Sequence, residues 1–479
     1  MAKMNFSKSI FILRQAPSIS YSTFNIKVLF VQYRIFSLFL IFLVLSGCSS
    51  YGTIHNQKQI LPKETYEPDF SITSKLQSRP RGNITLALAF SGGGTRAAAF
   101  AYGVLQELEQ TTLYHKNKSY RLIDEVDLIS AVSGGSFIAA YYGLHGQKTF
   151  KKFKKAMLQQ NIEDTLISAI LSPFSWFLTT GRTEIAIQLY NNTLFKNATF
   201  QDLNKPGSPL ILINASDLGN GVRFSFVQEY FDLICSDINN YPIARAVAAS
   251  SAVPVAFNPV IIQNFQPCDN LAHEKLQLAA LRVQHNNELK QATNGLKNYI
   301  EINYPYLHLV DGGITDNLGL RAIYEAVELS GGANHFAKRI GKPPAKSLAV
   351  ISVDASAQTA PEFRLSNKVP SIKESIDAMT DIQIHRYNTS TLNLFSKALT
   401  KWSAELSTPQ NKVTPFFITL NFNQLSTPEH RSELNNIPTS LSLTEPEITK
   451  LIHAGRFLLK NNSSFQALIK QLSTKGKSK

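Results

Sequence analysis

Residues 88–101 read LAFSGGGTRAAAFA: an apolar run, three consecutive glycines, an arginine and a series of small helix-forming residues. Each glycine costs conformational entropy on folding, so three in a row indicate that the backbone itself is needed there. Two chemistries use such a loop. One is a phosphate cradle at a helix N-terminus, and the other is an oxyanion hole built from backbone N–H groups. Motifs elsewhere in the sequence distinguish between these two possibilities.

On both sides of this stretch, apolar strand patterns alternate with helical patterns. Residues 84–90 and 126–132 are short apolar runs bounded by turn signals, which indicates buried strands. Between them, helical spacing of apolar residues runs from about Arg96 to Glu109. Such alternation is typical of an α/β fold with a mainly parallel central sheet and helices on both faces. Further strands are expected at 209–217, 222–228, 308–311 and 347–355.

The next strand-to-helix junction reads Ala131-Val132-Ser133-Gly134-Gly135. It matches the G-x-S-x-G nucleophile elbow, in which small residues flank a sharp turn so that a strained serine can present its Oγ. Alanine, the smallest substitute, stands in the first glycine position. A serine that only caps the following helix is the alternative interpretation. The strand–turn–helix context favours a nucleophile.

A nucleophilic serine needs an oxyanion site and a base. The backbone N–H groups of Gly92, Gly93 and Gly94, at the positive end of a helix, can supply the oxyanion site. Asp311, in the stretch VDGG, is the candidate base, because a carboxylate bonded directly to the serine can accept its proton if desolvation raises its pKa. An aspartate in an ordinary Gly-Gly turn is the alternative. The later histidines lie outside Gly-rich settings: His335, His385, His430 and His453.

The three motifs GGGTR, AVSGGS and DGG, in this order, resemble the patatin-like phospholipase family. Further similarity lies in NASDLGNGVRFSF, ARAVAASSAVPVAFNPV and HLVDGGITDNLGLR, so that the resemblance covers roughly residues 84–355. The resemblance implies a three-layer patatin-like fold without a metal or other cofactor. It implies that Ser133 is the nucleophile, Asp311 the base, Gly135 part of the elbow and Gly92–Gly94 the oxyanion hole. Ala131 departs from the family pattern and bears on how tight the elbow is.

The function expected from this resemblance is a lipid acyl hydrolase of the phospholipase A type that acts on membrane phospholipids. A lysophospholipase, general esterase or thioesterase of the same mechanism is an alternative, and so is a catalytically silent scaffold. Nucleotide binding is disfavoured, because the acidic residues Asp124, Glu125 and Asp127 lie about 30 positions after the glycines instead of about 20. Arg96 is expected to order the glycine loop or to attract an anionic headgroup, a solvated surface arginine being the alternative.

The N-terminus indicates export. Basic residues precede the apolar run IFSLFLIFLVL, which is too short to span a bilayer, and LSGC follows at residues 45–48. This stretch resembles the lipobox of bacterial lipoproteins, which implies a signal peptide at 1–47, lipid attachment to Cys48 and a location in the cell envelope, at the outer membrane. An uncleaved anchor is the alternative. Residues 48–82 are polar with scattered prolines and are expected to form a flexible tether.

Charge and cysteine content indicate which partners, disulfides and metal sites can be expected. The formal net charge is +14, and removing the first 47 residues, which hold five basic and no acidic residues, lowers it to +9. Nucleic-acid binding is not expected, because a moderately basic surface of this kind commonly serves solubility alone. Cys235 and Cys268 are expected to form a disulfide or to remain two buried thiols. No spacing of metal ligands is present, and the oligomeric state does not follow from the sequence.

The predicted domains are a catalytic domain at 83–360 and a C-terminal α/β extension at 361–479 that packs on it. The extension is expected to hold a long polar helix at about 371–403, a strand at 416–422 and a closing helix with a capping box at Thr444 and Glu447. Residues 268–300 predict a polar helical insertion. The apolar segment 165–182, interrupted by Pro173, is either a lid or a core helix.

Overall fold

One mixed sheet organises the structure. Its strand order is β12-β11-β2-β5-β6-β10-β9, and β7 pairs with β6. The strands from β12 to β6 are parallel to their neighbours, whereas β10, β9 and β7 are antiparallel. The predicted α/β fold with a mostly parallel sheet is therefore confirmed. The strands span Ile84–Phe90 (β2), Val126–Val132 (β5), Leu210–Asp217 (β6), Val222–Ser225 (β7), Val260–Gln263 (β9), Tyr306–Asp311 (β10), Ser347–Val353 (β11) and Thr414–Leu420 (β12).

The computed structural model describes Tyr33 and residues 52–59, 70–80, 82–115, 118–171, 181–254, 256–268, 271–300, 304–357 and 362–473. Contacts separate the chain into the units 1–50 and 51–479, and the second unit contains the sheet. The predicted signal peptide and Cys48 lie outside the described residues. Within the described residues, no helix combines the length and the apolar character that crossing a bilayer would require.

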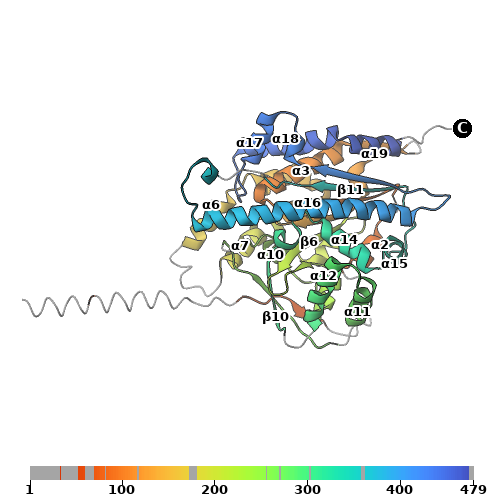
Figure 1. Cartoon of the computed structure of the whole chain (residues 1–479), viewed down its shortest axis with the longest axis horizontal. Helices are drawn as coiled ribbons and strands as arrows, with labels where there is room; N and C mark the ends of the chain where they lie inside the picture. The colour runs from red at the N-terminus through yellow and green to blue at the C-terminus, as the bar shows by residue number, and fades with distance from the viewer. Residues whose placement is uncertain are drawn as a thin grey trace, which may run out of the picture. The chain divides into compact units, whose positions relative to one another are not determined.

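Helices cover both faces of the sheet. The helices α3 (Gly94–Gln110), α4 (Gly134–His145) and α18 (Glu445–Asn461) pack together on one face, and α14 (Leu320–Leu329) and α16 (Ile372–Leu406) pack on the other. Figure 1 shows α18 and α19 (Ser463–Ser473) along one side of β11 and α16 along the other. The central strands are buried on both faces because they carry almost only apolar residues.

Shorter elements complete the unit. The predicted helical insertion between β9 and β10 consists of α11 (Ala272–Arg282) and α12 (Asn287–Lys297). The other helices and strands are α5 (Thr149–Phe153), α6 (Ile162–Leu171), α7 (Arg182–Tyr190), α8 (Phe200–Leu203), α9 (Gln228–Asp232), α10 (Ile243–Ser250), α13 (Gly313–Asp316), α15 (Ala333–Arg339), α17 (Pro428–Asn435), β3 (Thr112–His115) and β4 (Lys118–Arg121).

The described parts of residues 48–82 differ from the predicted flexible tether. β1 (Gln57–Lys58) pairs with β8 (Ser236–Asp237), and α2 (Ile72–Ser78) packs on the domain. Lys75 is buried, and its amine donates to the carbonyls of Leu203 and Lys205 and to Ser208 Oγ. These bonds compensate the cost of burying its charge. The described parts of this segment thus make specific hydrogen bonds with the domain. Residues 60–69 lie outside the described residues.

The C-terminal third is continuous with the rest of the unit. β12 pairs with β11 over seven positions and extends the sheet. The predicted capping box is present, since Thr444 and Glu447 form reciprocal bonds at the start of α18. The predicted domain boundaries at 47/48, 82/83 and 360/361 stay predictions.

The apolar segment at 165–182 is described only in part, by α6 and the start of α7. Ile162 and Leu166 of α6 are buried, whereas Ile167 is about half exposed. The first turns of α6 are therefore anchored in the core. Residues 172–180, on which the choice between lid and core depends, lie outside the described residues.

Candidate active site

Ser133 occupies the sharp turn between β5 and α4. Its φ of 50° and ψ of −123° lie where side-chain-bearing residues rarely occur. Such strain persists only where the surroundings enforce it, and it concentrates at functional sites. Ala131 lies within β5, paired with Phe90 of β2 and Ile213 of β6, and is fully buried. Alanine in the first glycine position of the motif is thus accommodated inside the strand.

The two glycines after Ser133 permit a very close approach to the glycine loop. A Cβ at Gly134 would lie 2.0 Å from the carbonyl oxygen of Gly94, and a Cβ at Gly135 would lie 2.8 Å from Ser91 O. Gly134 and Gly135 therefore have no space for a side chain. Their close contact fixes the glycine loop beside the serine, as the elbow motif predicts.

Asp311, at the end of β10, meets Ser133 directly. Ser133 Oγ donates to Asp311 Oδ2 at 2.7 Å, although the two residues are 178 positions apart in the chain. The other carboxylate oxygen accepts the N–H of Gly313 at 2.7 Å. Burial raises the pKa of Asp311 to about 6, and the bonds from Ser133 and Gly313 oppose this rise. At neutral pH, a buried carboxylate close to its pKa is thus placed to take the serine proton.

A second serine supports the elbow. The N–H of Ser133 donates to Ser250 Oγ at 2.8 Å, and Ser250 Oγ donates to Asn214 O at 2.6 Å. Ser250 also accepts the N–H of Gly312 through its carbonyl, at 3.1 Å. Ser250 thus contacts both strand ends that carry the dyad. Ser250 is not among the residues predicted from the sequence, although it lies in the small-residue stretch ARAVAASSAVPVAFNPV.

The three glycines of the loop differ in what their N–H groups do. The N–H of Gly92 donates to Asn317 O at 3.0 Å, so Gly92 does not supply an oxyanion donor in this structure. Among the described residues, the N–H groups of Gly93 and Gly94 meet no acceptor. Gly93 and Gly94 have φ of 132° and 60°, a region that favours glycine. The expected oxyanion site therefore reduces to Gly93 and Gly94.

The N–H of Gly134 belongs to the same group of donors. It follows Ser133 directly, and among the described residues it too meets no acceptor. The position that a Cβ of Gly134 would take lies 2.7 Å from Gly94 N, so the two backbone stretches converge. The elbow motif itself predicts this donor, since the residue after the nucleophile supplies an N–H. Gly134 is not among the oxyanion donors predicted above from the glycine loop.

Arg96 is buried and orders the loop, which contradicts both the headgroup interpretation and a solvated arginine. It is 3% exposed, and its guanidinium donates to Ala355 O, Ile437 O and Thr439 Oγ1 at 2.9, 2.5 and 2.9 Å. Burial lowers its pKa to about 10. The loop-ordering interpretation fits these contacts, and they tie the start of α3 to segments far along the chain.

The carbonyl of Ser440 occupies the N-terminus of α3. It accepts the N–H of Thr95 at 2.9 Å, and a Cβ at Gly94 would lie 2.4 Å from it. A phosphate cradle would need this helix end to be open to a ligand. The structure therefore disfavours the nucleotide interpretation of the glycine loop.

Three further expectations can be compared with the structure. Cys235 and Cys268 form a disulfide with a Cα–Cα distance of 5.9 Å. Within the described residues, no group of three His, Cys, Asp or Glu side chains could hold a metal ion. His385 donates to Ala357 O and lies on α16. Ser133 Oγ meets Asp311, not a histidine.

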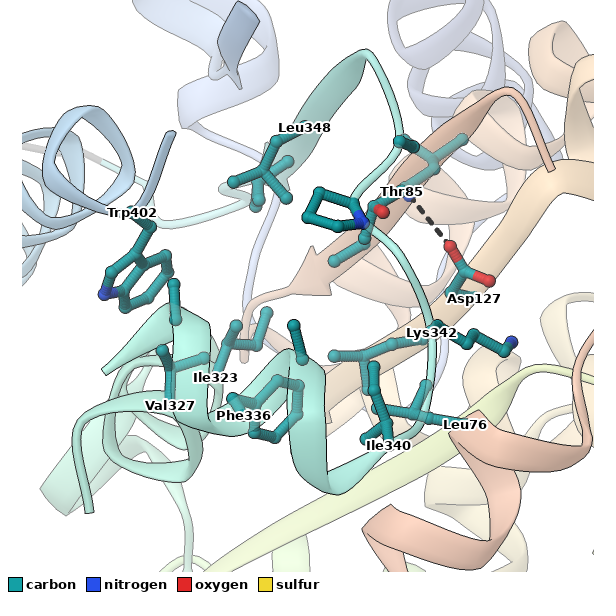
Figure 2. Close-up of a pocket in the computed structure, with 18 of the residues that line it drawn as sticks. Leu76, Thr85, Asp127, Ile323, Val327, Phe336, Ile340, Lys342, Leu348 and Trp402 are labelled. Atoms are coloured by element: carbon teal, nitrogen blue, oxygen red, sulfur yellow. Dashed lines mark hydrogen bonds between the residues drawn. The ribbon is translucent and has the colours of Figure 1, made fainter. Parts of the chain in front are cut away.

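Two cavities differ in their position relative to the dyad. A polar cavity of about 280 Å³ lies beside Ile314 and Thr315, directly after Gly313, and contains Arg223 and Arg321 paired with acidic residues. An apolar cavity of about 260 Å³ lies at the opposite ends of the strands, around the first residues of β2 and β5 (Figure 2). The second cavity is therefore separate from the candidate active site.

Comparisons with known proteins identify the family that the central part of the chain matches. Residues 88–324 match the model of the family described as patatin-like phospholipase. No curated protein matches the sequence. Among solved structures, human GIVD cytosolic phospholipase A2 is similar at 12% identity and a TM-score of 0.42, over 81% of this chain and 62% of that protein. VipD from Legionella pneumophila is similar at 13% identity and a TM-score of 0.26, over 78% and 67%.

The chain thus spans about three fifths of the length of the human phospholipase. The family match covers the glycine loop, the elbow and Asp311 together. Residues 88–324 of this chain form a domain of the patatin-like phospholipase family.

Proposed function

We propose that this protein is a lipid acyl hydrolase of the phospholipase A type, with Ser133 as nucleophile and Asp311 as base. The observation that carries the proposal is the 2.7 Å hydrogen bond from Ser133 Oγ to Asp311 Oδ2, at a strained elbow beside backbone N–H donors. The family match supports hydrolysis of a lipid in general terms. The dyad and the phospholipid substrate are our inference.

In the first half of the reaction, Asp311 takes the proton of Ser133 as Oγ attacks the acyl carbonyl carbon. The N–H groups of Gly93, Gly94 and Gly134 stabilise the negative charge that develops on the carbonyl oxygen. Protonated Asp311 then returns its proton to the departing lysolipid alkoxide. In the second half, Asp311 takes a proton from the water that attacks the acyl-serine, and it returns this proton to Ser133 Oγ as the Oγ–acyl bond breaks and the fatty acid leaves.

Exposed apolar residues near the candidate active site support a membrane substrate. We call Ile372, Ile376, Met379 and Ile382 the α16 stripe; each is between 50% and 81% exposed. Their spacing places them along one side of the helix. Soluble proteins rarely expose such a row without a partner. The row reaches the active-site end of the sheet, because His385 donates to Ala357 O just beyond β11.

The polar cavity beside Ile314 supports a substrate with a charged headgroup. It follows directly on the loop of Asp311, and it contains both arginine and glutamate side chains. A phospholipid headgroup carries the charges that such a cavity can match. This observation favours a phospholipid over a neutral ester or a thioester.

The proposed location is the cell envelope. A signal peptide at 1–47 would direct export, and a lipid on Cys48 would hold the enzyme at a membrane surface, for which we propose the outer membrane. Both features rest on the sequence, since the residues concerned lie outside the described part of the chain.

The test uses the chain from Ser49 onward and mixed phospholipid micelles. Wild type is compared with Ser133→Ala and Asp311→Asn, with and without EDTA, and the release of fatty acid is measured. We expect release by wild type that EDTA does not change, and a loss of at least about 10³-fold in both variants. A folded wild-type protein that releases no fatty acid and resists a fluorophosphonate probe would indicate the silent scaffold.

A further inference from the structure

Asn317 lies between the loop of Asp311 and the glycine loop. It is buried, directly after α13, and its carbonyl accepts the N–H of Gly92 at 3.0 Å. The positions that Cβ atoms of Gly92 and Gly313 would take lie 2.7 Å and 3.2 Å from Asn317 Oδ1. The amide oxygen of Asn317 therefore fills space that two glycines leave open, one in each loop.

The same two glycines place Asn317 beside the dyad. A Cβ at Gly92 would lie 3.3 Å from Ser133 Cβ, and a Cβ at Gly313 would lie 3.0 Å from Asp311 Oδ1. Among the described residues, the hydrogen bonds of Asn317 go to neither side chain of the dyad. Any influence of Asn317 on the reaction therefore passes through the position of the two loops.

A cluster of polar side chains fixes the orientation of the Asn317 amide. Asn317 Nδ2 donates to Ser356 Oγ at 2.9 Å and to Asn388 Oδ1 at 3.5 Å. Asn388, buried on α16, donates to the same Ser356 Oγ at 3.1 Å. Burial raises the pKa of Asp354, and hydrogen bonds from the side chain and the N–H of Ser356 oppose this rise. Because the Ser356 hydroxyl donates to Asp354, it accepts from the amides, and this turns the Asn317 oxygen towards the glycines.

The segment that holds the Asn317 side chain also braces the glycine loop. The N–H of Ala355 donates to Ser91 Oγ at 2.8 Å, and Ser91 Oγ donates to Gly92 O at 2.9 Å. Gly92 is thus fixed on both sides, at its N–H by Asn317 and at its carbonyl by Ser91. The two oxyanion donors that follow Gly92 in the loop take their direction from it.

We propose that Asn317 is a positioning residue, a spacer held by Ser356 that sets the oxyanion donors at a fixed place relative to Asp311. This inference rests on the proposed function, since it assigns a role in that reaction. Donors that are fixed beforehand stabilise a developing charge without reorganisation. A displacement of about 1 Å in such a site can lower the rate about 10²-fold. Loss of the spacer therefore lowers kcat, while groups that bind the ground state stay in place.

The first test compares Asn317→Ala with Asn264→Ala on a soluble ester. Asn264 is the matched control, because it is also buried and its Nδ2 donates to two carbonyls, those of Tyr299 and Tyr304, at the other end of β10 from Asp311. We expect kcat of Asn317→Ala to fall about 10–100-fold with little change in KM, and Asn264→Ala to keep both values. Equal kcat in the two variants, or a rise in KM alone, would overturn the proposal.

The second test uses Ser356→Ala, which removes the acceptor of the Asn317 amide and leaves both loops unaltered. Ser352→Ala is its control, because Ser352 is buried and its Oγ has no partner among the described residues. Amide hydrogen exchange of residues 88–100 is measured, which requires no turnover. We expect faster exchange in Ser356→Ala than in Ser352→Ala, and equal exchange would overturn the proposal. A wild-type protein that hydrolyses no ester would count against the proposed function, and the exchange measurement would still decide whether Asn317 fixes the loop.

Discussion

The environment of Asp311 sets the pH range in which the proposed enzyme works. Burial raises its pKa to about 6, and only the deprotonated carboxylate can accept the proton of Ser133. We therefore expect kcat/KM to be level above this value and to fall about tenfold per pH unit below it. Hydrolysis of a soluble ester between pH 4.5 and 8 measures the profile. A profile that stays flat down to pH 5 would contradict a carboxylate base with this pKa.

The same shift has a consequence for stability. The pKa of Asp311 is about 6 in the folded chain, above its ordinary value of 3.8. The folded state therefore loses stability as the pH rises between these two values, and it regains that stability as the pH falls again. Asp311→Asn keeps the shape without the charge. It should raise the free energy of unfolding by up to about 3 kcal/mol at pH 8 and by little at pH 4. Thermal unfolding at both values tests this, with Ser133→Ala as the neighbouring control.

We expect Arg96 to support catalysis by holding the glycine loop in place and not by contacting the substrate. Arg96→Lys loses the fork that joins Ala355, Ile437 and Thr439, and should cost about 3 kcal/mol of stability. The oxyanion loop would then be held less firmly. We expect kcat to fall while KM for lipid changes little. A rise in KM with unchanged kcat would contradict this positioning role.

At the residue scale, the candidate dyad could be predicted from the sequence because its residues lie in short local motifs. Ser133, Asp311 and the small residues around them follow from short patterns whose chemistry is local. The role of Gly92 did not follow, because its acceptor, Asn317, lies 225 positions away. The contacts of Arg96 are equally remote, at residues 355, 437 and 439.

At the scale of elements, α16 divides into two halves with different surroundings. Its C-terminal half packs in the core through Phe395, Leu399 and Trp402, each at most 3% exposed. Its N-terminal half carries the α16 stripe and meets solvent. One helix thus serves both as part of the core and as an exposed apolar row beside the candidate active site.

We expect the double variant Ile376→Asp/Met379→Asp to lose most activity on vesicles and to retain activity on a soluble ester. The reason is that aspartates in the stripe oppose contact with a lipid surface while the dyad is untouched. Vesicle co-sedimentation and both activities are measured. The matched control is Leu278→Asp/Leu281→Asp, two exposed leucines on α11. An equal loss in both double variants would contradict a specific role of the stripe.

The bounds of a secondary-structure element were predicted correctly where one hydrophobic pattern ran through the whole segment. β2 and β5 have the predicted bounds, since uninterrupted apolar runs between turns leave little choice. The stretch ARAVAASSAVPVAFNPV is helical only up to Ser250, because the chain turns there and brings Ser250 against Ser133 and Gly312. The pairing of residues 57–58 with 236–237 could not be predicted from the sequence either. A two-residue strand leaves no periodic hydrophobic pattern that would reveal its distant partner.

At the scale of the whole molecule, the C-terminal third completes the candidate active site. The family match ends at residue 324, yet the start of α3 is held by Ile437, Thr439 and Ser440. The same segment reaches α6, because Leu441 N–H donates to Glu163 Oε2. The strand that precedes it, β12, is part of the central sheet. An extension beyond the family domain therefore positions the glycine loop.

This dependence predicts that a change on α18, far along the chain from the dyad, lowers activity. α18 packs on α3 so closely that a Cβ at Gly455 would lie 2.3 Å from Phe100 O. Gly455→Val must separate the two helices, at a cost of about 1–3 kcal/mol, and shift the loop at the start of α3. We expect slower fluorophosphonate labelling of Ser133 even where the protein remains folded. His453→Val, on the exposed side of the same helix, should label like wild type. Unchanged labelling in a destabilised Gly455→Val variant would mean that α18 supports the fold without positioning the site.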